Sequence, residues 1–116
     1  MTEPIDTPLE LDVSEQGDVR VVRIWGSVGM NEADRLRIAL DEVVAEPARI
    51  VVLDLSGMDF ICSLGLGAMI AAYQKVRSRA GDLKLVNPQP PIRQVLEATR
   101  LTELFPIFPS VEEALL

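Results

Sequence analysis

The sequence predicts a single α/β domain, with a mostly parallel sheet of about five strands, an opening β-hairpin and about four helices. Three observations predict this class. Two β-rich segments lie on either side of a short turn near the start of the chain. A continuous apolar run at residues 50–55 is typical of a central parallel strand. Beyond the hairpin, strand-like and helix-like segments alternate, and 116 residues are enough for one hydrophobic core.

The first elements are a loose segment and a hairpin. Residues 1–8 contain two prolines and two acids, which predicts a loose N-terminal segment. Residues 9–14 alternate between apolar and polar side chains, as expected for a half-buried strand. A Gln-Gly-Asp sequence at residues 16–18 has turn composition, and residues 19–25 then read as the second strand.

The first helix is expected over residues 31–46. The sequence Gly-Ser-Val-Gly at residues 26–29 should break the second strand. Asn31 can then cap the helix, with Asp34 three residues on in a position that resembles a capping box. Apolar residues recur at helical spacing on one side of this segment, and Pro47 should end it.

The central strand and the second helix follow. The strand at residues 50–55 should end at Ser56 and Gly57, which have turn composition. A second short apolar piece leads to Ser63, and the helix is expected over residues 64–80. Gly81 and Asp82 should end it.

The remaining elements are short. Residues 83–86 read as a strand, and a proline-rich turn leads into a helix over residues 92–98. Pro106 places the strand at residues 104–108 at a sheet edge, because proline cannot donate to the ladder. Ser110 can cap a last helix whose first turn contains Glu112 and Glu113.

Composition excludes several classes of function. A net charge of −7 disfavours binding to nucleic acid or to an anionic membrane surface, and no apolar stretch is long enough to predict a transmembrane helix. The chain has one cysteine and no histidine, so an internal disulfide and a Ser-His-Asp triad are excluded. We therefore expect a cytoplasmic protein that is not an enzyme, with no catalytic residues, metal site or cofactor.

Ser63 is the residue with the most informative chemistry. It stands where an apolar helix is expected to start, and a serine there can cap the helix. The same position also suits phosphorylation, because a helix N-terminus favours a bound or attached anion. From the local pattern alone, both roles remain open.

Three segments of the chain resemble a known family. The sequence DLSGMDFICSLGLG at residues 54–67 resembles the signature of STAS domains, the family of bacterial anti-sigma factor antagonists. Ile24-Trp25-Gly26 and the helix after it are similar to the family's strand–Gly–loop–helix element, and residues 96–115 look like its usual ending. The resemblance covers residues 9–116, which we interpret as one STAS domain.

The resemblance implies a non-enzymatic switch. Such a protein binds an anti-sigma factor that is also a serine kinase, and so releases a sigma factor. The kinase phosphorylates the antagonist, and a cognate phosphatase resets it. The family motif places the phosphorylated residue at Ser63. The residues expected to bind the partner are Ser27, Val28, Gly29, Met30, Asn31, Cys62, Ser63, Leu64 and Gly65.

Two departures from the motif leave a second function open. Cys62 replaces the family's aspartate, and Leu64 replaces its second hydroxyl residue. Both changes make the expected surface less acidic and more apolar. This fits an interaction subunit that is not phosphorylated, such as the STAS-like subunits of lipid-transport ATPase complexes. The sequence leaves the oligomeric state and the identity of the sigma factor open.

Overall fold

The computed structural model describes residues 8–116, and it confirms the predicted α/β architecture. The predicted loose segment at residues 1–8 lies, except for Pro8, outside the described residues. One five-stranded sheet has the order β1-β2-β3-β4-β5, with β1 antiparallel to β2 and the other neighbours parallel. The strands are β1 (Glu10–Gln16), β2 (Val19–Val28), β3 (Ile50–Ile61), β4 (Asp82–Val86) and β5 (Ile107–Phe108).

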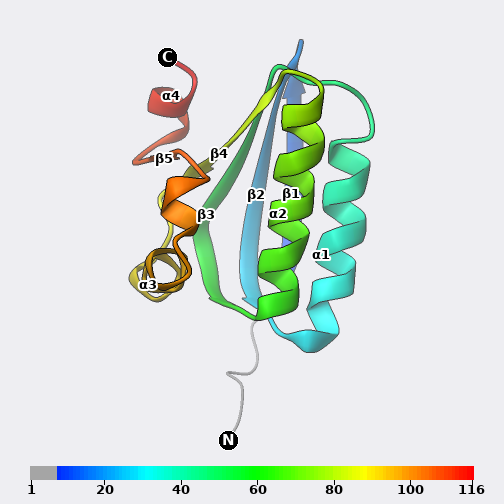
Figure 1. Ribbon diagram of the computed structural model, residues 1–116. Helices are drawn as coiled ribbons and strands as arrows, with labels where there is room; N and C mark the ends of the chain where they lie inside the picture. Colours follow the sequence, from blue (N-terminus) through cyan, green and yellow to red (C-terminus); the bar gives the residue numbers. More distant parts are fainter. Residues whose placement is uncertain (1–7) are drawn as a thin grey trace, which may run out of the picture.

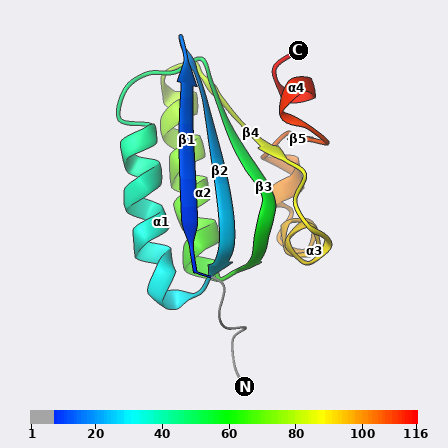
Figure 2. The ribbon, with the colours of Figure 1, turned by 180° about the vertical axis from the view of Figure 1, so that it is seen from behind.

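Two long helices cover one face of this sheet. Helices α1 (Met30–Val43) and α2 (Ser63–Ser78) lie side by side against it (Figure 1). From behind, β1, β2 and β3 lie in front of them, with α3 (Pro90–Ala98) and α4 (Val111–Ala114) to one side (Figure 2). A 3₁₀ turn, η1 (Leu101–Glu103), joins α3 to β5. Both connections that follow β2 and β3 are therefore strand–helix units of the kind that build parallel sheets.

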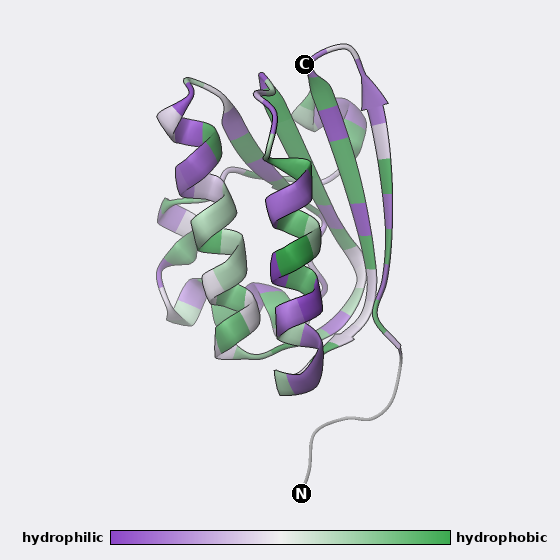
Figure 3. Cartoon of the chain, turned by 90° about the vertical axis from the view of Figure 1, so that its right-hand side faces the viewer, coloured by the Kyte–Doolittle hydropathy of each residue, from purple (hydrophilic) through white to green (hydrophobic). Residues whose placement is uncertain are grey.

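The core is built on the alternation of side chains along β3. Val51 and Leu53 belong to the larger apolar cluster, which includes the buried residues of α1 and α2. Ile50 and Val52 belong to a smaller cluster that α4 covers with Ala114. Figure 3 shows hydrophobic and hydrophilic bands along the helices and strands, as expected where each element buries one side. The apolar run predicted as the central strand therefore has both faces covered at its start.

Strand β1 forms one edge of the sheet, and its polar side chains are exposed. Its residues pair with β2 from Glu10 opposite Trp25 to Gln16 opposite Val19. Six of its seven residues are exposed, including the acids Glu10, Asp12 and Glu15. Acidic side chains on an edge strand oppose pairing with another strand of like charge.

The sequence placed the ends of β2 and β3 too early. Gly26 does not break β2, which continues to Val28 because Gly26 adopts φ +98° and the ladder resumes after a register shift. Ser56 and Gly57 do not form a turn, and β3 continues to Ile61. Gly57 instead lies beneath Trp25, where a side chain would collide with the indole ring. Bulges of this kind bend a strand without ending it, so turn-like residues were misread as strand ends.

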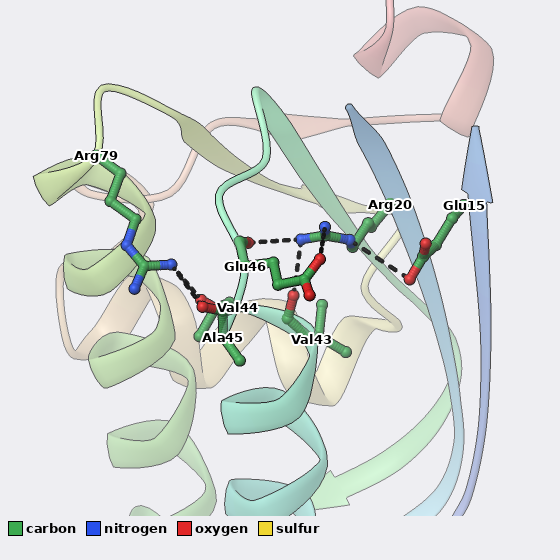
Figure 4. A network of polar contacts seen from close by, with 7 residues as sticks. All are labelled: Glu15, Arg20, Val43, Val44, Ala45, Glu46 and Arg79. Carbon is green, nitrogen blue, oxygen red and sulfur yellow. Dashed lines mark hydrogen bonds and ion pairs between the residues drawn. The ribbon is translucent and has the colours of Figure 1, made fainter. Parts of the chain in front are cut away.

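The first helix ends earlier than predicted, because arginines bind its last carbonyl groups. Helix α1 stops at Val43 rather than at residue 46. Arg20 is 7% exposed and donates to the Val43 carbonyl at 2.9 Å and to the Glu46 carbonyl at 2.8 Å (Figure 4). Arg79 donates to the Val44 and Ala45 carbonyls at 2.8 and 3.0 Å. The two guanidinium groups satisfy carbonyl groups that a longer helix would have bonded internally. Their positive charges also interact favourably with the negative, C-terminal end of the helix dipole.

The C-terminal elements differ from the predictions only at their ends. Helix α2 ends at Ser78, and Ala80 then adopts φ +65°, which no continuing helix allows. Helix α3 begins at Pro90, because prolines fit the first helical turn. Strand β5 is only Ile107–Phe108, shorter than the predicted strand at residues 104–108, and η1 lies just before that segment, where the sequence predicted no element. The predicted cap is confirmed, since Ser110 Oγ accepts from the Glu113 amide at 3.1 Å.

Arg20 provides a test of this packing. Replacing it by alanine should lower the free energy of unfolding by about 2–3 kcal/mol, because the Val43 and Glu46 carbonyl groups at the C-terminal end of α1 then lose their donor. Arg37 is a matched control, because it is an arginine on the exposed side of α1 whose ion pairs are with the surface acids Asp34 and Asp41. Arg37→Ala should change stability by less than about 0.5 kcal/mol. Urea unfolding of both variants measures the difference, and equal losses would contradict this role for Arg20.

Candidate functional site

Two strand-to-helix corners meet at the carboxyl ends of β2 and β3. Val28 and Ile61 end these neighbouring strands and are partners in the parallel register. Beyond them, the Cys62 amide donates to the Val28 carbonyl at 2.8 Å. This bond ties the start of α2 to the turn before α1. Ligand and partner sites in open α/β sheets lie at this end of the strands.

A glycine allows the second helix to lie close to both strands. A Cβ built at Gly65 would lie 2.8 Å from Ile61 Cγ1 and 2.9 Å from Val28 Cγ1. Real side chains do not approach so closely, so any other residue would push α2 away from the strands. A Cβ at Gly67, two residues along the same helix, would point into open space among the described residues. Gly65 is therefore a packing residue, although the sequence suggested it as part of the binding surface.

The first helix begins one residue earlier than predicted, and a different residue caps it. Gly29, not Asn31, is the N-cap, and the Glu32 carboxylate accepts from the Gly29 amide at 3.0 Å. The predicted pairing of Asn31 with Asp34 is wrong, because both residues already lie within the helix. Gly29 is buried, which leaves Met30 and Asn31 as the exposed residues of this corner.

Ser63 is the first residue of α2 and does not cap it. The N-cap is Cys62, in extended conformation, with no side-chain hydrogen bond to the helix. The first turn of α2 contains no acidic residue. Ser63 is exposed and Cys62 is half-buried. The capping interpretation of Ser63 is therefore wrong by one residue, and its hydroxyl is not needed to satisfy the helix amides in that way.

The structure brings the predicted surface residues together but exposes only some of them. Met30 and Leu64 are large apolar side chains that are 60% and 55% exposed. They border one hollow of about 160 Å³, together with Ala33, Asp34 and Arg37 of α1. Ser27, Val28, Gly29 and Gly65 are buried and support this surface from beneath. We call the exposed group Met30, Asn31, Ser63 and Leu64 the apolar corner.

Sequence reasoning missed charged residues that border the apolar corner. Arg37 donates to Asp34 at 2.8 Å and to Asp41 at 3.2 Å along the exposed side of α1. The hydrogen bond and charge of Asp34, followed by those of Asp41, raise the pKa of Arg37 above its ordinary value. The sequence signal that could have revealed these ion pairs is their spacing, because acids three residues before and four residues after an arginine lie beside it on a helix. In the neighbouring strands, the Ser27 hydroxyl donates to Asp59 Oδ1 at 2.6 Å, for which no sequence pattern gave a signal.

The described part of the chain offers a surface for binding and no cluster for metal chemistry. Among residues 8–116, no group of three or more His, Cys, Asp or Glu side chains could hold a metal ion. Within the same range, every buried side-chain nitrogen or oxygen has a hydrogen-bond partner. No helix in this range has the length and apolar character needed to cross a bilayer. The apolar corner presents an exposed serine hydroxyl between exposed apolar side chains.

Comparison with known proteins identifies the family. The model of the STAS domain matches residues 10–114, which is almost the whole chain. This chain belongs to the STAS domain family. The recognition made from the sequence motifs is confirmed, and the STAS fold accounts for the antiparallel opening hairpin and the four helices.

Several relatives of this STAS domain are named as anti-sigma factor antagonists. An anti-sigma F factor antagonist of Paenibacillus polymyxa is 25% identical over 108 residues, which are 92% of each chain. An anti-sigma factor antagonist of Mycobacterium paratuberculosis has a crystal structure with a TM-score of 0.84 and 31% identity, covering 93% of this chain and 92% of that one. The phosphorylated form of SpoIIAA, a Bacillus cell fate determinant, has a TM-score of 0.71 at 20% identity, covering 93% and 96%, and shows the same fold.

Two glycines of α2 test the geometry of the corners. Gly65→Ala should destabilise the protein by about 1–3 kcal/mol, because the added methyl group collides with Val28 and Ile61. Gly67→Ala places the same methyl group in open space and should stabilise the helix by up to about 1 kcal/mol. Thermal or urea unfolding of the two variants measures the difference. If both variants gained stability, the close contact at Gly65 would be disproved.

Proposed function

We propose that this STAS domain is an anti-sigma factor antagonist controlled by phosphorylation of Ser63. The observation that carries the proposal is the exposed serine at the first position of α2, next to exposed Leu64 and Met30. In its unmodified form the apolar corner binds a serine-kinase anti-sigma factor, which then releases its sigma factor. The kinase phosphorylates Ser63 and the complex separates, and a cognate phosphatase removes the phosphate. The protein acts in the cytoplasm as a binding switch without catalytic activity of its own.

The helix N-terminus makes phosphorylation compatible with the fold. A phosphoserine has a charge of about −1.5 to −2 at pH 7. At an exposed helix N-terminus an anion is stabilised by about 0.3–1 kcal/mol, and the first turn of α2 has no acid to repel it. The modified protein should therefore stay folded, and the switch should act at the interface. A loss of about 1.4 kcal/mol of binding free energy weakens affinity tenfold, and a dianion forced into an apolar contact costs at least that much.

The relatives support this proposal in two ways. Proteins that match over most of this chain are named anti-sigma factor antagonists, including RsfB of Mycobacterium tuberculosis at 27% identity over 107 residues. One protein with the same fold, SpoIIAA, has been solved in a phosphorylated form. These names belong to those proteins, and for this chain they favour an anti-sigma factor as the partner.

Phosphorylation can be tested with two serines of one helix. We expect the purified protein to gain one phosphate when incubated with ATP and the anti-sigma kinases of its own organism. Ser63→Ala should abolish the gain, whereas Ser78→Ala, an exposed serine at the other end of α2, should keep it. Intact-mass measurement and peptide mapping give the result. Unfolding should show that Ser63→Ala costs less than about 0.5 kcal/mol, because Ser63 is not the cap. Phosphate on Ser63→Ala would place the modification elsewhere.

We propose as a second candidate a constitutive interaction subunit of a larger complex, such as a lipid-transport ATPase. The exposed apolar side chains of Met30 and Leu64 favour it, because a permanent interface buries such residues. Under this function the unmodified protein co-purifies with an ATPase and is not phosphorylated. Leu64→Ser should then break the complex, whereas Ser63→Ala should leave it intact.

A further inference from the structure

Gly67 is a glycine that the fold itself does not require. It lies within α2, which is a continuous α-helix. Gly67 does not have a positive φ, so its backbone conformation suits any residue. Outside its own stretch of helix, a Cβ at Gly67 would meet no atom of the described residues within 4 Å, whereas a Cβ at Gly65 would collide with Val28 and Ile61. Packing within the chain therefore explains Gly65 and leaves Gly67 unexplained.

Glycine is an unfavourable residue at an exposed position inside a helix. It loses more backbone freedom on folding than any other residue, and alanine forms helices better. Gly67 is exposed, and it lies one turn inside α2, away from the helix ends where glycine is favoured. Glycine also lets another backbone come close to the chain. Close approach by atoms from outside the chain is therefore the remaining physical reason for a glycine here.

Gly67 lies on the same side of α2 as Ser63 and Leu64. Residues three and four apart on a helix are neighbours on its surface, so Gly67 follows both by one turn. At about 1.5 Å of rise per residue, it is about 5–6 Å further along the helix axis. All three residues are exposed. A partner that covers the apolar corner therefore also covers Gly67, since a typical interface buries about 800 Å² on each side.

We propose that Gly67 is a specificity-determining residue of the partner surface, at which the main chain of the anti-sigma factor packs directly against α2. This inference rests on the proposed function and adds the shape of the partner to it. The partner places a segment with a small residue (glycine, alanine or serine) opposite Gly67, because a larger side chain would hold the two backbones apart. This close approach brings Ser63 and Leu64 into the same buried contact, so a phosphate on Ser63 forces the two surfaces apart.

The test adds side-chain atoms at Gly67 and measures binding and stability separately. Gly67→Ala adds one methyl group, and Gly67→Leu adds a larger side chain that also favours a helix. Ser78→Thr is the control, because it adds one methyl group to an exposed residue at the other end of α2. The probe is the purified serine-kinase anti-sigma factor of the same organism that binds the wild-type protein, used without ATP so that Ser63 stays unmodified. Calorimetry gives each affinity, and urea unfolding gives each stability.

We expect Gly67→Ala to unfold at a higher urea concentration than the wild type and to bind the anti-sigma factor about tenfold more weakly. The cores of interfaces are packed as densely as protein interiors, so a direct contact has no room for the methyl group. Gly67→Leu should bind still more weakly, whereas Ser78→Thr should match the wild type within about twofold. A variant that gains stability and loses affinity is folded, so misfolding cannot account for its loss of binding.

Equal affinities for the wild type and Gly67→Ala would overturn this inference and leave the proposed function standing. A loss of affinity for Ser78→Thr as large as that for Gly67→Ala would also overturn it, because the effect would not belong to Gly67. If no anti-sigma factor bound the wild type, the proposed function would fail, and this inference with it.

Discussion

One backbone hydrogen bond holds together the two strand-to-helix corners that form the proposed partner surface. The Cys62 amide donates to the Val28 carbonyl just beyond the last paired residues of β2 and β3. It joins two loops that are far apart in the sequence, and it fixes where both helices start. Gly65 makes this arrangement possible, because only a residue without a side chain lets α2 lie against Val28 and Ile61. The exposed side chains of the corner take their positions from this contact.

The far ends of the helices are held by a different kind of interaction. Arg20 reaches from β2 and Arg79 follows α2, and both donate to the carbonyl groups at the end of α1. Glu15 and Glu46 pair with Arg20 at 3.6 and 4.0 Å and balance its charge. The domain thus has the arginine–carbonyl contacts at one end of the sheet and the exposed apolar corner at the other. Rigid support at one end and open side chains at the other suit a protein that acts by binding.

The sequence predicted the type and order of the strands and α-helices, because hydrophobic periodicity reports burial. It failed where a local pattern was overridden by packing. Ser56 and Gly57 have turn composition, but in the structure Gly57 provides room for Trp25 within a strand. Asn31 is a good capping residue, but the register of β2 places Gly29 at the cap. The bulge at Asp59 had no signal, since it depends on how two strands align. The motif pointed to Ser63 as a phosphorylation site, which stays a prediction, and the local pattern predicted it as the helix cap, whereas the cap is Cys62, one residue earlier.

The acidic edge of the sheet has a consequence for the behaviour of the chain at high concentration. Strand β1 offers an open row of backbone groups, but Glu10, Asp12 and Glu15 stand along it. If two copies aligned these edges, their carboxylates would face each other and repel. With a net charge of −7, the same repulsion acts between whole molecules. This repulsion disfavours the growth of fibres through the exposed edge strand.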